Sequence, residues 1–180
     1  MRIGITLAIV MVILAFSSAI LGYAYATMQF QEKIGNIEAK IGLLTYAAEI
    51  INAKEHVEDS LFYAQTLIED ECIAESIGKV FNVNFTIKSN VKASANILFL
   101  KKLKHDLALL NETSPRVKYE ELHKQFVSIL ENYVGNYEKY VVYFENGKSC
   151  SELKTILTSL SSNYNKLSVL ANVIVKNISK

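Results

Sequence analysis

The chain has 180 residues, of which 51% are hydrophobic and 21% charged, and its one proline is Pro115. A chain this apolar and this poor in proline is not expected to be disordered or rich in linkers. Without Arg2, 18 basic residues balance 18 acidic ones, so nucleic acid is not expected as a partner, because phosphate binding needs a concentrated basic surface.

The first segment, residues 3–28, contains no charged side chain and is long enough to span a membrane as one helix. The apolar core of a secretory signal usually has about 7 to 15 residues, so the length favours a permanent anchor over residues 1–28. The alternative is a removable signal, because Ala24-Tyr25-Ala26 has the form that signal peptidase cleaves. In both cases the positive start at Arg2 stays in the cytoplasm and the bulk lies outside, either as a single-pass membrane protein or as a secreted one.

Small residues recur at every fourth position of this segment, a spacing that lets two membrane helices approach closely. They are Ser18, Gly22 and Ala26. The opening resembles the first helix of type IV pilins, which is likewise apolar and then amphipathic, with processing after a glycine such as Gly4. It departs from that family at Ala8 or Ile9, where pilins usually carry a glutamate, and in having no strand-rich second half.

An amphipathic stalk is predicted over residues 29–52, because apolar residues there alternate spacings of four and three, as in a heptad repeat. We call these residues the seam: Phe30, Ile34, Ile37, Ile41, Leu44, Ala48 and Ile51. No residue before the stalk stops a helix, so one helix is expected to run from the membrane segment to an end near Gly78, with a kink near Asn52 or a projecting stalk. The seam is predicted to pair with a second copy of the chain, as a homo-oligomer, or with a membrane-complex partner.

Residues 53–180 are predicted to form an extracytoplasmic helical bundle, so that the fold class is all-α, with an antiparallel bundle of about four helices. Residues 80–88 alternate like a strand, but they have no strand to pair with and are expected to form an extended connection. The next helix is expected over residues 90–110. Its predicted inner side carries Ile97, Leu100, Leu103, Leu107 and Leu110.

Ser114 and Pro115 are expected to open the third helix, as a cap and a first-turn proline. That helix carries a stripe of tyrosines, which is expected to fill the core, although it could instead line a ligand pocket. The turn at residues 145–152 precedes the fourth helix, for which Ser149 and Glu152 form a capping box.

Cys72 and Cys150 are expected at the same end of such a bundle, because neighbouring helices alternate in direction. In an oxidising compartment they would form a disulfide that closes a loop of about 78 residues. Two buried free thiols are the alternative.

The chain shows no pattern that predicts an enzyme, a cofactor or a metal site. Glu120 and His123 match half of a carboxylate-bundle motif, but no second half exists, and the three histidines are expected on solvated faces. The sequence has no phosphate-binding glycine loop and no zinc or haem spacing.

Three sequons, at Asn84, Asn111 and Asn177, are possible glycosylation sites.

The function expected from the membrane segment, the seam and the helical bundle is a membrane-anchored surface or accessory subunit that works by protein contact. A ligand-binding module similar in architecture to the helical periplasmic domains of chemoreceptors is the alternative.

Overall fold

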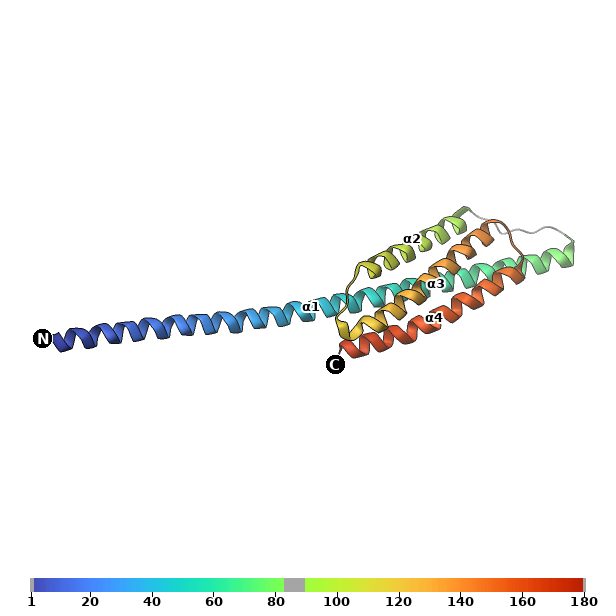
Figure 1. Cartoon of the computed structure of the whole chain (residues 1–180). Coiled ribbons are helices and arrows are strands. Elements are labelled where there is room, and N and C mark those ends of the chain that lie inside the picture. Colours follow the sequence, from blue (N-terminus) through green and yellow to red (C-terminus); the bar gives the residue numbers. More distant parts are fainter. Residues whose placement is uncertain (1, 83–89, 180) are drawn as a thin grey trace. The chain divides into compact units, whose positions relative to one another are not determined.

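The computed structural model describes the backbone of residues 2–82 and 90–179, and the side chains of residues 17–82 and 94–179. All regular structure in these residues is helical (Figure 1): α1 (Arg2–Phe81), α2 (Asn90–Glu112), the 3-10 turn η1 (Val117–Tyr119), α3 (Glu120–Glu145) and α4 (Cys150–Ile178). The predicted all-α class is therefore confirmed for the part of the chain that is described. Contacts divide the chain into two units, Met1–Leu43 and Leu44–Lys180.

The first unit is the N-terminal stretch of α1. The side chains of residues 1–16 lie outside the described part, so the predicted membrane segment 3–28 is covered only from residue 17 onward. Within the described residues, no helix has the length and apolar character needed to cross a membrane. The anchor therefore stays a prediction from the sequence.

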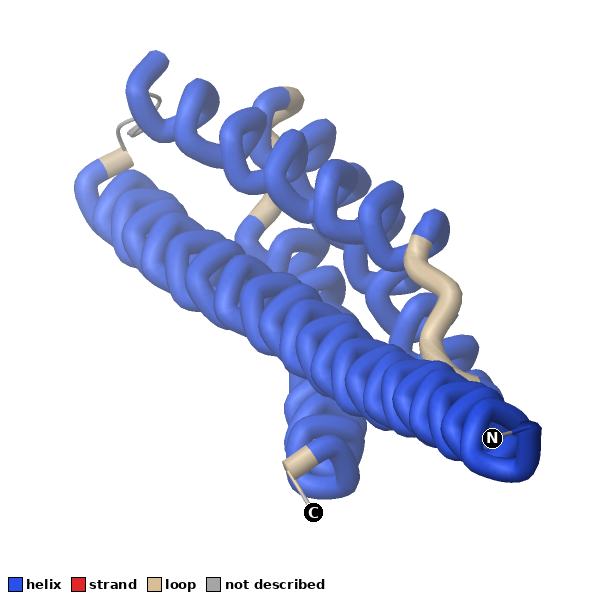
Figure 2. Tube along the Cα trace, turned by 90° about the vertical axis from the view of Figure 1, so that its left-hand side faces the viewer, coloured by secondary structure: helices blue, strands red, loops and turns tan. Residues whose placement is uncertain are grey.

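The second unit is a bundle in which the rest of α1 lies beside α2, α3 and α4 (Figures 1 and 2). Glu49 accepts a hydrogen bond from the Thr113 hydroxyl at 2.9 Å, and further along α1 the ring of Tyr63 packs on that of Phe99. These two contacts show that α2 runs opposite to α1.

α3 runs back in the direction of α1, because Tyr46 meets His123 and Ser60 meets Tyr133. α4 returns beside them. The Tyr119 hydroxyl, just before α3, donates to the carbonyl of Asn177 near the end of α4 at 3.1 Å. The alternation of direction that the sequence predicts is thus confirmed.

α1 contains no break at Asn52, and it continues past the predicted end at Gly78 to Phe81. An exposed ion pair of 2.6 Å between Lys79 and Glu75 spans the turn that contains Gly78. Asn82 then takes a positive φ of 53°, a left-handed conformation that asparagine tolerates well and that ends the helix. Residues 83–89, most of the predicted extended connection, lie outside the described residues.

The third helix does not begin at Ser114 and Pro115, and that prediction is wrong. Arg116 is extended (φ −57°, ψ 148°), so helical geometry cannot continue from Pro115. The chain instead forms η1, and α3 starts after Tyr119 without a side-chain cap. The capping box of α4 is confirmed, because the Glu152 backbone N–H donates to the Ser149 hydroxyl and the Ser149 N–H donates to the Glu152 carboxylate.

The core lies between α3 and the inner faces of the other helices. The spacing of the third helix predicts eight inward-facing residues, and six of them are buried: Tyr119, Phe126, Tyr133, Tyr137, Tyr140 and Phe144. The other two, Leu122 and Ile129, are only half-buried. The stripe predicted for α2 is wrong in part, because Ile97 is 40% exposed, whereas Asn96 and Asp106 are buried with Leu103 and Leu110. Two polar residues therefore replace apolar ones on the inner face of α2.

Candidate interaction surface and polar core

The seam of α1 is exposed at all seven positions, and its six large side chains are between 38% and 65% exposed. A different face of the same helix packs into the bundle: Tyr46, Ala47, Ile50, Ala53 and Val57 are buried. The bundle was predicted to begin at residue 53, but buried residues of α1 begin earlier, at Tyr46. Among the residues whose side chains are described, α1 thus carries a buried apolar face within the bundle and a second apolar stripe, the seam, that is exposed.

The small residues predicted to support helix packing also lie on exposed parts of α1. Ser18 and Ala26 are exposed, and a Cβ on Gly22 would have no described atom within 4 Å apart from its chain neighbours and the backbone of its own helix.

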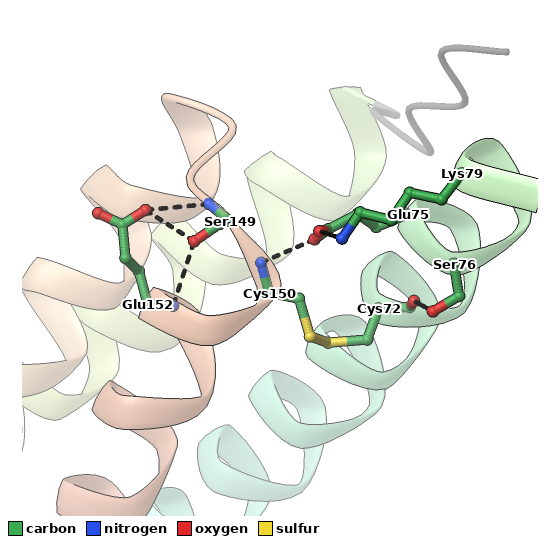
Figure 3. A network of polar contacts seen from close by, with 7 residues as sticks. All are labelled: Cys72, Glu75, Ser76, Lys79, Ser149, Cys150 and Glu152. Carbon is green, nitrogen blue, oxygen red and sulfur yellow. Dashed lines mark hydrogen bonds and ion pairs between the residues drawn. A yellow bond between two sulfur atoms is a disulfide. The ribbon is translucent and has the colours of Figure 1, made fainter. Parts of the chain in front are cut away.

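The cysteine pair lies where the sequence placed it, at the junction of α1 and α4 (Figure 3). Cys72 and Cys150 form a disulfide, and their Cα atoms lie 5.2 Å apart. Glu75 accepts a hydrogen bond of 3.0 Å from the backbone N–H of Cys150. The hydrogen bond from Lys79, and then that from Cys150, hold the pKa of the Glu75 carboxyl below its usual range. The carboxylate therefore stays charged next to the positive end of α4.

The tyrosine stripe forms a polar network inside the bundle. The hydroxyl oxygens of Ser60 and Tyr133 lie 2.8 Å apart, and each is within 3.1 Å of the Val57 carbonyl oxygen. The Tyr137 hydroxyl donates to the amide oxygen of Asn96 at 3.2 Å, and the amide nitrogen of Asn96 donates to the Tyr140 hydroxyl at 3.4 Å.

Burial is the main cause that raises the pKa of each of these three tyrosines, which keeps them neutral. Their rings are buried and their hydroxyls bond within the bundle. The core-filling interpretation of the stripe is therefore confirmed for these three tyrosines.

His123 is buried, so the prediction of a solvated face is wrong for this histidine. Its ring donates to the Leu110 carbonyl, which leaves Nδ1 to accept a hydrogen bond from the Tyr46 hydroxyl at 3.2 Å. Burial, and then the charge of Glu49, raise the pKa of Tyr46 to about 12, so its hydroxyl proton is retained. A surface groove of about 650 Å³ lies beside this pair, and Thr113, His123 and Lys124 are among the residues that line it.

Burial lowers the pKa of His123, against smaller opposing effects of the Leu110 carbonyl and Glu49. Because the unfolded chain takes up a proton on this side chain more readily than the folded chain does, stability should fall as the pH drops below about 6.5. Chemical denaturation of the wild type and of His123→Gln across this range should show a smaller loss in the variant. The matched control is His105→Gln, which changes an exposed histidine and should keep the wild-type pH dependence. Equal pH dependence in all three would contradict the assignment.

The remaining candidate ligands do not assemble into a site. His56 forms a hydrogen bond of 2.7 Å with the Asp106 carboxylate, and Glu120 forms an ion pair with Lys124. No group of three or more His, Cys, Asp or Glu side chains that could hold a metal ion occurs among the described residues. Of the sequons, Asn111 is exposed, Asn177 is half-buried, and Asn84 lies outside the described residues.

The sequence analysis missed four buried polar side chains: Ser60, Asn96, Asp106 and His123. A signal for two of them exists, because Asn96 and Asp106 share the spacing of Leu103 and Leu110 along one side of α2.

Comparison with known proteins does not add to this description. No family model, no curated protein and no solved structure matches the chain.

Proposed function

We propose that the protein is a membrane-anchored, extracytoplasmic helical bundle that acts without catalysis, through protein contacts, as a surface or accessory subunit of a larger assembly. The observation that carries this proposal is the exposed seam on α1, where six large apolar side chains follow one heptad stripe. Soluble monomers rarely expose a contiguous apolar surface of this kind, and such surfaces commonly mark interaction sites.

The proposed location rests on two further features. The uncharged segment 3–28 has the length of a membrane-spanning helix. The disulfide between Cys72 and Cys150 is of a kind that forms and persists mainly in oxidising compartments, such as the cell exterior. Both features support an anchor whose bundle faces outward.

The test is to purify the full chain from native membranes in mild detergent and to measure the mass of the complex it forms. Ile37→Asp places a charge in the middle of the seam and should abolish the complex, because a buried unpaired carboxylate is strongly unfavourable in an apolar interface. The matched control is Asn36→Asp, which adds the same charge at the neighbouring exposed position outside the seam and should leave the complex intact.

An unchanged complex in Ile37→Asp would overturn the proposal that the seam is the assembly surface. The intact mass of the same material tests the anchor: a membrane-bound chain of full length supports it, whereas a soluble species that begins at Thr27 shows a secreted protein. For the ligand-binding alternative, the expected result would be a small molecule that raises the melting temperature of the purified bundle.

A further inference from the structure

We infer that the seam binds a second copy of the chain, parallel and in register; this rests on the proposed function, in which the seam is an assembly surface. The observation that selects this partner is the pair of charges beside the seam. Lys33 precedes Ile34, and Glu38 follows Ile37. Both charged side chains are exposed, and neither forms an ion pair within the described residues.

The heptad assigns these residues to complementary positions. Ile34 and Ile41 occupy the first apolar position, a, and Phe30 and Ile37 occupy the second, d. Lys33 is then at position g and Glu38 at position e of the next heptad. In a parallel, in-register pair of helices, g of one helix lies beside e of the following heptad in the other.

Two copies of the chain therefore form the same ion pair twice, Lys33 of each with Glu38 of the other. In this arrangement each isoleucine of the seam also lies beside the same isoleucine of the second copy. Isoleucine at the a positions, here Ile34 and Ile41, is typical of two-stranded parallel coiled coils.

The opposite orientation is disfavoured by the same charges. In an antiparallel pair, g positions face g positions, and both g residues in this stretch, Lys33 and Lys40, are lysines. Like charges at these positions destabilise the pairing. Attachment of both copies to one membrane, as in the proposed function, also sets their helices parallel.

Charge reversal tests the pairing in the purified full chain, with the dissociation constant measured by analytical ultracentrifugation in detergent. Lys33→Glu and Glu38→Lys should each weaken self-association by on the order of tenfold, because each turns two attractive pairs into two repulsive ones. The double variant Lys33→Glu/Glu38→Lys should recover most of the wild-type affinity. The matched control Glu32→Lys makes the same change as Glu38→Lys at an exposed position away from the seam and should have little effect.

Disulfide trapping tests the orientation. Phe30→Cys alone and Ile41→Cys alone should each give a covalent dimer under mild oxidation, because equivalent residues adjoin in a parallel, in-register pair. An antiparallel pair would give a dimer only when the two variants are mixed. Asn36→Cys, outside the seam, is the control that should stay uncrosslinked.

The outcomes separate this inference from the proposed function. If the purified chain is monomeric while Ile37→Asp still abolishes the native complex, the seam binds a different protein and the self-pairing inference is wrong. If charge reversal has no effect, or the double variant is no better than either single one, the Lys33–Glu38 pairing is wrong. If Ile37→Asp leaves the native complex unchanged, the proposed function itself fails.

Discussion

Replacement of both cysteines, Cys72→Ala/Cys150→Ala, is expected to lower the free energy of unfolding by about 4 kcal/mol. The disulfide joins residues separated by 78 positions, and in the chain-entropy account a cross-link stabilises the fold by removing conformations from the unfolded chain. For a domain of this size the loss corresponds to a fall in melting temperature on the order of 10 °C. Differential scanning calorimetry of the wild type and the variant measures it.

The wild type under reducing conditions is the control for this prediction. It should melt close to the double variant, and the variant itself should not respond to the reductant. A variant that melts with the oxidised wild type would show that the bond contributes little. A variant less stable than the reduced protein would show that the cysteines also contribute by packing.

Asn96→Ala is expected to lower the free energy of unfolding by about 3 kcal/mol, because Asn96 is part of the polar network in the core. Asn96 is fully buried and accepts a hydrogen bond from Tyr137 while donating one to Tyr140. Its removal leaves two buried hydroxyl groups without these partners, and each unsatisfied group costs about 1–3 kcal/mol. Urea denaturation monitored by circular dichroism gives the difference.

The control is the variant Asn96→Leu/Tyr137→Phe/Tyr140→Phe, which removes all the polar groups of this contact together. Because no hydroxyl is then left unpaired, it should be clearly more stable than Asn96→Ala. If Asn96→Ala costs less than about 1 kcal/mol, water or a rearranged side chain satisfies the two tyrosines, and the network is less important than its geometry suggests.

The sequence predicted the features of this fold that depend on strong local patterns. The apolar face of α3, the capping box at Ser149 and the meeting of Cys72 with Cys150 follow from helical spacing, cap chemistry and alternating helix direction. The start of α3 could not be predicted in this way, because the extended conformation of Arg116 is not apparent from Ser114 and Pro115.

The buried polar residues could not be predicted from the spacing of apolar residues along the sequence. Hydrophobic periodicity treats Asn96, Asp106 and His123 as surface residues, yet each is buried beside a partner on another helix. Such partners become visible only when the helices are placed together, since Tyr137 and Asn96 are 41 positions apart. The seam shows the converse: its spacing predicts an apolar stripe, but only the structure shows that the bundle uses a different face of α1.

The bond between Cys72 and Cys150 also divides the chain into a closed ring and two open ends. The covalent ring, residues 72–150, contains α2 and α3, whereas most of α1 and nearly all of α4 lie outside it as linear branches. A single backbone cut at any point between the two cysteines therefore leaves one covalent molecule, with both branches still attached. If the bundle faces the cell exterior, as proposed, a nick of this kind by a protease would not separate residues 1–72 from residues 150–180 as long as the sulfurs stay oxidised.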